Sequence, residues 1–292
     1  MTPGRFLLCT DLDRTLIPNG SQPESQRARE YLESFVSRPE VTLVFVSGRD
    51  RVLVEHAISG YDLPTPDFVI GDVGTTIYRV GPTHDWSALA AWQHEIAVDW
   101  GGKSAADLQR ILGDLDGLQL QESSKQNLFK VSFYVPVDLD IGGLSSVIHQ
   151  RLETAGIQAR LVWSVDEVDN TGLLDVLPLR ASKLHAIEAL MRQQGFNSDN
   201  TVFCGDSGND MEVLVSPVPA VLVANGHEDV KRRAMELAQQ AGTEKQLYIA
   251  GGNFLNMNGN YAAGMLEGIV HYHPDMLSWF GQGANAFGRT RQ

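Results

Sequence analysis

Short apolar runs alternate with amphipathic stretches near the start of the chain. The apolar runs have the length of strands, and the stretches between them place side chains such as Leu32 and Phe35 on one face of a helix. The predicted elements are a strand over residues 6–10, a helix over 22–37, a strand over 41–47, a helix over 49–59, a strand over 68–71 and a run over 76–80 that makes a hairpin around Gly74. This order is typical of a parallel sheet covered by helices, so we predict an α/β fold with a Rossmann-like core.

The alternation returns late in the chain after a stretch of different texture. The late elements are a helix over residues 182–194, a strand over 201–204, a helix near 211–215, a strand over 220–223 and a helix over 228–241. The stretch between has helical patterns at 105–112 and 144–155 and strand-like runs at 129–135 and 159–164. We therefore predict a core domain from residues 1–82 and 173–292, with an α+β domain of residues 83–172 inserted into it. Residues 250–260, rich in Gly and Asn, are predicted to form a loop, and the last dozen residues to be disordered.

The balance of charges excludes some partners. With 36 Asp and Glu against 23 Lys and Arg, the formal net charge is −13, which argues against nucleic acid and against an anionic membrane surface. The apolar runs are far shorter than the roughly 20 residues of a membrane-spanning helix. The N-terminal segment lacks the basic region of a secretory signal, so we expect a soluble, cytoplasmic protein. Cys9 and Cys204 lie in apolar runs and are expected to be buried thiols.

Two aspartates separated by one residue follow the first predicted strand. The strand over residues 6–10 runs directly into Asp11 and Asp13. Ligands of open α/β sheets bind at the carboxyl ends of the strands, so this position suits a functional site. A lone Asp-x-Asp serves equally well in a turn or a helix cap, and the assignment needs support from elsewhere.

Three other predicted strand ends supply that support. Asp206 and Asp210 follow the strand over residues 201–204, with glycines that permit tight turns and close approach to a ligand. Ser47 ends another strand just before a helix begins, a place that suits phosphate oxygens. Lys183 opens a helix after the strand end at residues 175–178. Acids, a hydroxyl and an ammonium at four strand ends indicate one shared site.

These groups fit phosphoryl transfer. Several carboxylates at one point repel each other, and a hard divalent cation relieves that repulsion; Mg²⁺ is the usual choice where phosphate and water complete its coordination. The cation also neutralises phosphate, so that a carboxylate can attack phosphorus as a nucleophile. A second acid nearby can protonate the leaving alkoxide and then activate water.

The segments that carry these residues resemble the four motifs of the haloacid dehalogenase superfamily of phosphatases in order, spacing and strand context. The resemblance implies a mobile cap of the larger α/β kind, formed by the inserted domain and reading the substrate. It implies Asp11 as nucleophile, Asp13 as general acid and base, Thr15 as a support of the loop, Ser47 with Gly48 and Arg49 at the phosphoryl group, and Lys183 between nucleophile and phosphate. It implies Mg²⁺ as cofactor, bound by Asp11, by Asp206 and by the backbone carbonyl of Asp13, with Asn209 and Asp210 in support.

One position departs from the superfamily pattern. Arg14 stands before Thr15, where such proteins often have glycine or another small or polar residue. The side chain is either a solvent-facing loop arginine or a contact to the substrate or the cap.

A finer resemblance narrows the substrate. Residues 126–132, 175–183 and 263–271 are similar to segments of the bacterial sucrose-phosphatase group. That similarity implies a small phosphorylated sugar as the substrate, with sucrose 6-phosphate first and mannosylfructose phosphate or glucosylglycerol phosphate as alternatives. It also makes a glycosyltransferase of the same pathway a conceivable partner.

The cap segment offers candidate contacts to a sugar. Hydroxyls need paired donors and acceptors, and the C–H faces of a sugar need apolar contact. The candidates for substrate binding are Gln126, Asn127 and Lys130, with Tyr134, Trp163, Ser164, Asp166 and Asp169 in addition, although each is also a plausible solvated edge residue. Trp86, Trp92 and Trp100 cluster where the cap begins, and we expect packing rather than a sugar platform.

Two other functions suit the same pattern. A sugar phosphomutase uses the phospho-aspartate but returns the phosphate to a sugar. A non-catalytic module that supports a glycosyltransferase would show degraded motifs, whereas all the expected acids are present. A P-loop kinase is disfavoured, because no Gly-x-x-x-x-Gly-Lys-Ser/Thr run occurs.

Overall fold

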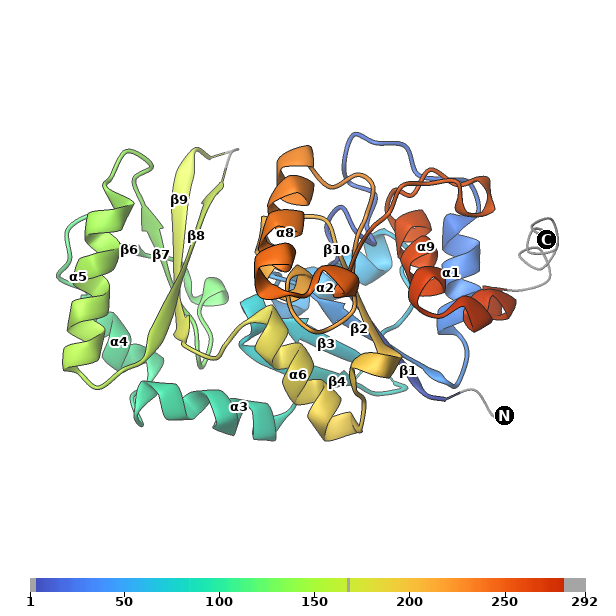
Figure 1. Ribbon diagram of the computed structural model, residues 1–292. Helices are drawn as coiled ribbons and strands as arrows, with labels where there is room; N and C mark the ends of the chain where they lie inside the picture. The colour runs from blue at the N-terminus through green and yellow to red at the C-terminus, as the bar shows by residue number, and fades with distance from the viewer. Residues whose placement is uncertain (1–3, 84, 167–168, 281–292) are drawn as a thin grey trace.

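A large, mostly parallel sheet forms the centre of the molecule (Figure 1). The computed structural model describes residues 4–83, 85–166 and 169–280, so the predicted disorder of the last dozen residues lies outside the described range. In the described residues the sheet has eight strands in the order β12-β11-β10-β1-β2-β3-β4-β5. Their bounds are β1 Phe6–Thr10, β2 Val41–Val46, β3 Phe68–Gly71, β4 Thr76–Val80, β5 Trp86–Ala88, β10 Thr201–Gly205, β11 Ala220–Leu222 and β12 Leu247–Ile249.

The predicted α/β fold is confirmed, and β1 shows why its sequence is apolar throughout. Phe6 and Leu8 point into the core on one face of the sheet, whereas Leu7 and Cys9 point into the core on the other. A strand buried on both faces has no polar side to present to solvent. Cys9 and Cys204 are buried free thiols, as predicted.

Helices cover both faces of the large sheet. α1, α2 and α9 pack on one face, and α3, α6, α7 and α8 pack on the other. Their bounds are α1 Ala28–Val36, α2 Arg51–Gly60, α3 Ala90–Ala97, α6 Lys183–Gln194, α7 Met211–Leu214, α8 Glu228–Ala241 and α9 Ala262–Tyr272. Within the described part of the chain, no helix combines the length and the apolar character that crossing a membrane requires.

A smaller antiparallel sheet stands beside the large one. Its order is β6-β7-β9-β8, with bounds β6 Gln119–Leu120, β7 Val131–Val135, β8 Ala159–Asp166 and β9 Thr171–Pro178. α4 (Ala105–Leu112) and α5 (Ile141–Thr154) cover the face that points away from the large sheet (Figure 1). The opposite face therefore looks toward the core and is free to line a site.

The chain crosses between the large and the small sheet at positions other than the predicted domain boundaries of 82/83 and 172/173. β5 pairs with β4, and Trp92 and Ile96 of α3 pack in the core of the large sheet, so residues 86–97 lie with that sheet. β9 pairs along its length with both β7 and β8, which places residues up to Pro178 in the small sheet. A strand of three residues, and a helix of eight residues with only Trp92 and Ile96 buried, carry too little pattern to be recognised in a sequence.

The predicted helices and strands lie close to observed ones, whereas α3, α9, β5, β6 and β12 were not predicted. The helix predicted over residues 22–37 begins only at Ala28, and the helix predicted from residue 49 begins at Arg51, because the side chain of Asp50 caps it by accepting from the N–H of Leu53. The hairpin around Gly74 is confirmed by the antiparallel pairing of β3 with β4. Trp92 and Trp100 are fully buried, which confirms packing as their role.

Candidate active site

Three strand ends meet around Asp11. β1 lies between β10 and β2, so Asp11 lies between the residues that follow those strands, Asp206 and Ser47. The N–H of Asp11 donates to the carbonyl of Cys204 at 2.8 Å, and the N–H of Ser47 donates to the carbonyl of Ile70 at 2.8 Å. Hydrogen bonds to neighbouring strands thus fix the backbone positions from which the side chains of Asp11 and Ser47 project.

Lys183 brings a cation to the same point. The hydroxyl of Ser182 caps α6 by accepting from the N–H of His185, so the helix begins with Lys183. The Lys183 Nζ lies 3.0 Å from Asp11 Oδ1, 2.6 Å from Asp210 Oδ1 and 3.2 Å from Asn209 Oδ1. Burial lowers the pKa of Lys183, but the charges of Asp11 and Asp210 outweigh this effect and raise it, so the side chain stays an ammonium. The structure therefore brings Lys183, Asp206 and Ser47 together around Asp11, as the sequence predicted.

Asp13 is held by an arginine that was predicted to contact phosphate. Arg49 donates from Nε to Asp13 Oδ2 at 2.8 Å and from Nη2 to Asp13 Oδ1 at 2.6 Å. Asn19 Nδ2 donates to Asp13 Oδ1 at 2.8 Å. Burial raises the pKa of Asp13, but the bonds from Arg49 and Asn19 outweigh it and lower the pKa below its usual value. Arg49 therefore orients Asp13 in this structure.

The buried carboxylates form a fitting site for a hard cation. Oxygens of Asp11, Asp206 and Asp210 lie within 4.8 Å of one another. Asp210 Oδ2 already accepts from the N–H groups of Asp206 and Ser207, at 3.1 and 3.3 Å, and Thr15 Oγ1 donates to Asp206 Oδ1 at 3.5 Å. Clustered carboxylate oxygens are the donors that Mg²⁺ prefers, so Asp11 and Asp206 would hold the ion and Asp210 would support them.

The same cluster raises the pKa of two carboxyls. Burial is the main cause for both, and the charge of Asp210 adds to it. Burial raises the pKa of Asp11 to about 7, although the charge of Lys183 opposes this rise. Burial likewise raises the pKa of Asp206 to about 6, although the charge of Arg14 opposes this rise. Without a cation, both groups hold protons more tightly in the folded state than in the unfolded chain.

These pKa values predict how stability depends on pH and Mg²⁺. A carboxyl with a raised pKa stabilises the folded state at acidic pH and loses that contribution as the pH rises through its folded value, here between about 4 and 7. A metal ion needs the deprotonated groups, so its binding strengthens over the same range. We expect MgCl₂ to raise the thermal unfolding temperature of EDTA-treated protein markedly at pH 8 and little at pH 5. An equal rise at both pH values, or a full rise in Asp206→Asn, would contradict the assignment of this cluster as the cation site.

Arg14 makes a contact that its position in the sequence did not indicate. Its Nε lies 3.4 Å from Asp206 Oδ2, and its side chain is 45% exposed. Its Nη2 donates to the backbone carbonyl of Asn225 at 3.5 Å. The guanidinium thus pairs with a carboxylate of the site while the side chain stays exposed, as the first interpretation predicted. It also lines the cavity around Asp11, and a contact to the substrate stays a prediction.

Two cavities meet at the site. A small cavity of about 300 Å³ is lined by Asp11, Asp13, Arg14, Ser47, Gly48, Arg49, Asp206, Ser207 and Asn209. A larger one of about 1080 Å³ lies between the small sheet and the core. Gly48 and Asn209 line both, and Lys183 lines the larger cavity. A substrate can therefore place its phosphate beside Asp11 and the rest of the molecule against the small sheet.

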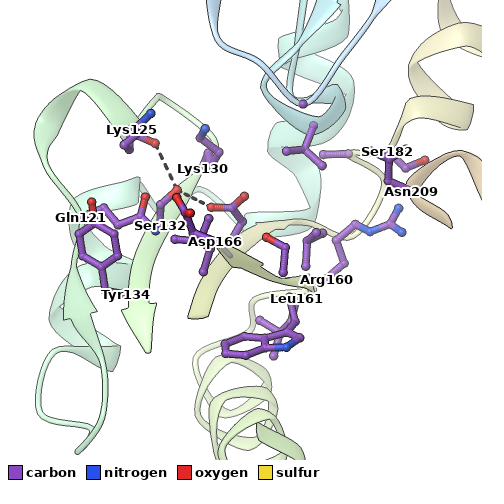
Figure 2. A pocket seen from close by; sticks show the side chains of 18 of the residues that line it. Gln121, Lys125, Lys130, Ser132, Tyr134, Arg160, Leu161, Asp166, Ser182 and Asn209 are labelled. Carbon is purple, nitrogen blue, oxygen red and sulfur yellow. Dashed lines mark hydrogen bonds between the residues drawn. The ribbon is translucent and has the colours of Figure 1, made fainter. Parts of the chain in front are cut away.

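Polar side chains of the small sheet face the larger cavity (Figure 2). Of the predicted cap residues, the lining includes Lys130, Tyr134, Trp163, Ser164, Asp166 and Asp169. Lys130 Nζ also lies 3.1 Å from Asp72 Oδ1, and both side chains are almost fully buried. A buried pair of this kind fixes Lys130 at the wall of the cavity.

Gln126 and Asn127 have other partners than a substrate. The Gln126 amide donates to the carbonyls of Gln121 and Ser132 and accepts from the N–H of Ser132, which closes the turn before β7. Asn127 Nδ2 donates to Thr75 Oγ1 at 2.9 Å, between the small sheet and the core. Neither residue is among those that line the two cavities in the described part of the chain. Both amides therefore have partners within the protein, and their assignment as substrate-binding residues stays a prediction.

Sequence reasoning missed the Arg160–Glu212 pair at the larger cavity and Asp72, the partner of Lys130. Arg160 of β8 pairs with Glu212 of α7 at 3.3 Å, across the space between the small sheet and the core, and both line the cavity. Asp72 directly follows β3 and pairs with Lys130. The strand-end argument that found Asp11 and Asp206 would have found Asp72, whereas Arg160 lies within a strand and carries no local signal.

Known proteins resemble the chain in sequence and in fold. A putative HAD-like hydrolase of Nitrosococcus oceani is 48% identical over 279 residues, which cover 96% of this chain and 75% of that protein. Sucrose-phosphatase 1 of Nicotiana tabacum is 28% identical, and the match covers 92% of this chain but only 59% of the tobacco protein. The mannosylfructose-phosphate phosphatase of Agrobacterium fabrum is 28% identical, with 91% of this chain and 96% of that protein covered. A solved structure of the sucrose-phosphatase of Synechocystis sp. PCC6803, in complex with sucrose and phosphate, superposes with a TM-score of 0.69 at 23% identity and covers 92% of this chain and 98% of that one.

The fold and these matches define the chain as a phosphoric monoester hydrolase of the haloacid dehalogenase type. The sequence also matches the family model of sucrose-6F-phosphate phosphohydrolases over residues 4–273. The chain belongs to that family.

Proposed function

We propose that this protein is a Mg²⁺-dependent phosphatase that hydrolyses a glycoside phosphate, with sucrose 6-phosphate as the first candidate, through a phospho-aspartate at Asp11. The observation that carries the proposal is the position of Asp11, a buried carboxylate 3.0 Å from the Lys183 ammonium. A nucleophile in this position meets phosphate beside a fixed positive charge, which offsets the repulsion between the two anions.

The chemistry would proceed in two displacements. An oxygen of Asp11 attacks phosphorus, the P–O bond to the sugar breaks, and the sugar alkoxide takes a proton from Asp13. A water molecule then gives a proton to Asp13 and attacks the phosphorus of the phospho-aspartate, which releases phosphate and restores Asp11. Bound Mg²⁺ would supply positive charge to the phosphoryl oxygens in both steps. Because Arg49 holds Asp13 ionised, the pair would have to open before Asp13 carries a proton, whereas the ionised form already suits the second step.

The larger cavity supports a substrate of disaccharide size. Its volume of about 1080 Å³ is at the upper end of ordinary small-molecule sites. Its lining combines carboxylates, the hydroxyl of Tyr134 and the indole of Trp163, which suit the hydroxyls and C–H faces of a sugar. The names of the relatives, sucrose-phosphatase and mannosylfructose-phosphate phosphatase, favour the same substrate class. In this proposal the small sheet with α4 and α5, most of which lies in the predicted insert of residues 83–172, acts as the cap that reads the sugar, and a glycosyltransferase of the same pathway stays a predicted partner.

A panel of initial rates tests the substrate. We expect phosphate release from sucrose 6-phosphate, mannosylfructose phosphate or glucosylglycerol phosphate to exceed that from glucose 6-phosphate and fructose 6-phosphate by at least about tenfold in kcat/KM, a difference of about 1.4 kcal/mol in binding the transition state. EDTA should stop release, and Mg²⁺ should restore it. Equal rates on all compounds would contradict a glycoside-reading cap. Retention of the phosphate on added sugar bisphosphate, with no free phosphate, would instead indicate a phosphomutase.

A further inference from the structure

The loop that carries the two aspartates contains a residue in an unusual backbone conformation. Arg14 has a φ of 57°, in the left-handed region that residues with a side chain rarely adopt. Such conformations persist only when the surroundings hold them in place, and they are frequent at functional sites. Arg14 therefore requires partners that fix it.

Two asparagines hold the backbone of Arg14 from opposite ends. Its N–H donates to Asn19 Oδ1 at 2.8 Å, and its carbonyl accepts from Asn225 Nδ2 at 2.6 Å. Asn225 is 4% exposed and follows β11, so it comes from a strand end that the proposed mechanism does not use. Its Oδ1 accepts from the N–H of Tyr261 at 2.8 Å, which anchors the amide at the start of α9.

The conformation of residue 14 decides where two groups of the cation site lie. In a trans peptide the carbonyl of Asp13 points away from the N–H of Arg14, so the direction of that N–H also sets the direction of the carbonyl. The same residue places its guanidinium 3.4 Å from Asp206 Oδ2. A rotation of the backbone at residue 14 would move both the Asp13 carbonyl and the positive charge beside Asp206.

We propose that Asn225 is a positioning residue of the Mg²⁺ site, which holds Arg14 in the left-handed conformation and thereby aims the Asp13 carbonyl. The inference rests on the proposed function in one respect, that the Asp13 carbonyl and Asp206 bind the ion. It gives the backbone directly after the Gly- and Asn-rich segment a role, because the N–H of Tyr261 fixes the orientation of the Asn225 amide.

Asn260 offers a matched control from the same region. It is 9% exposed, and its Nδ2 donates to the carbonyl of Pro23 at 3.0 Å, so its replacement also removes a buried amide-to-carbonyl bond. A general loss of stability would thus appear in both Asn225→Ala and Asn260→Ala. An effect through Arg14 would appear only in the first.

Asn225→Asp isolates geometry from charge. The aspartate keeps the acceptor for the Tyr261 N–H but places an oxygen against the Arg14 carbonyl, which breaks that contact. Its added negative charge would by itself strengthen binding of a cation. Weaker Mg²⁺ binding in this variant therefore reports the position of the loop. The variant also keeps the test decisive if Asn225→Ala does not fold.

The measurement is the Mg²⁺ dependence of thermal unfolding at pH 8, fitted to an apparent Kd, together with the Mg²⁺ concentration for half-maximal hydrolysis of p-nitrophenyl phosphate. We expect Asn225→Ala and Asn225→Asp to raise the apparent Kd and the half-maximal Mg²⁺ concentration about 10- to 100-fold, the range for residues that orient metal ligands. Asn260→Ala should change these two values less than about twofold. Unchanged or tighter binding in Asn225→Asp, or an equal loss in Asn260→Ala, would overturn the inference alone. A wild-type protein that Mg²⁺ does not stabilise would overturn the proposed metal site, and the inference with it.

Discussion

Replacement of Asp11 by asparagine should abolish turnover, with a fall in kcat of at least about 10³-fold. Asparagine keeps the shape of the side chain but is a far weaker nucleophile, so no phospho-enzyme should form. The fold should persist, because a neutral side chain removes one of the clustered negative charges at a position that is only 4% exposed. Lys183 keeps Asp210 as an anionic partner at 2.6 Å. The measurement is phosphate release from sucrose 6-phosphate, with circular dichroism and the unfolding temperature as checks on the fold.

Asp99→Asn is the matched control for this experiment. Asp99 is a buried aspartate outside both cavities of the described structure, where it accepts from the N–H of Arg180 and pairs with its guanidinium. Its replacement should leave kcat within about threefold of the wild type. Near-normal activity in Asp11→Asn would move the nucleophile elsewhere and end the phospho-aspartate proposal. Equal losses in both variants would point to a defect of folding.

The strand ends were readable from the sequence because their signal is local. Each apolar strand passes directly into its polar residues, and the parallel order of strands brings these ends to one edge of the sheet. The positions of Asp11, Ser47 and Asp206 along the chain were therefore enough to predict that they lie together. Their roles in catalysis remain predictions that the variants above test.

Contacts between distant segments could not be read in the same way. The bond between Asn225 and Arg14 joins residues 211 positions apart, and neither position has a local pattern that indicates it. The Gln126 amide shows the converse case, since it looks suited to a sugar but is consumed by backbone groups of its own turn. Which polar side chains stay free for a ligand is decided by tertiary structure.

Helix α9 escaped prediction because it is buried nearly all round. In α9 every residue from Ala262 to Ile269 is buried, including Glu267, which accepts from Tyr248 Oη and from the N–H groups of Gly251 and Gly252. An amphipathic stripe is the pattern that reveals a surface helix, and a helix enclosed on all sides does not have one. The loop predicted over residues 250–260 leads into this helix, so the prediction found the connection and missed the element.

Replacement of Lys183 by methionine should cost both stability and activity. The ammonium is 5% exposed and lies between Asp11 and Asp210, which are themselves almost fully buried. Removing one partner from a buried ion pair leaves an uncompensated charge, which typically destabilises a protein by about 3–5 kcal/mol. We expect a loss of that size in the free energy of unfolding by urea, measured at pH 8 in EDTA. We also expect a fall in kcat of at least about 10²-fold, because a fixed charge beside the phosphate is lost.

The cause of the destabilisation can be separated from a simple packing defect. If it arises from repulsion between Asp11 and its neighbours, the loss should shrink at pH 5, where Asp11 and Asp206 with pKa values of about 7 and 6 are protonated in the folded protein. Added Mg²⁺ should also recover part of it at pH 8, since a second cation restores the missing charge. Lys103→Met, a change of the same residue type at an exposed position, should alter neither stability nor its pH dependence. A loss in Lys183→Met that stays constant between pH 5 and 8 and does not respond to Mg²⁺ would mean that the lysine fills space, and that the carboxylates around it do not share a cation site.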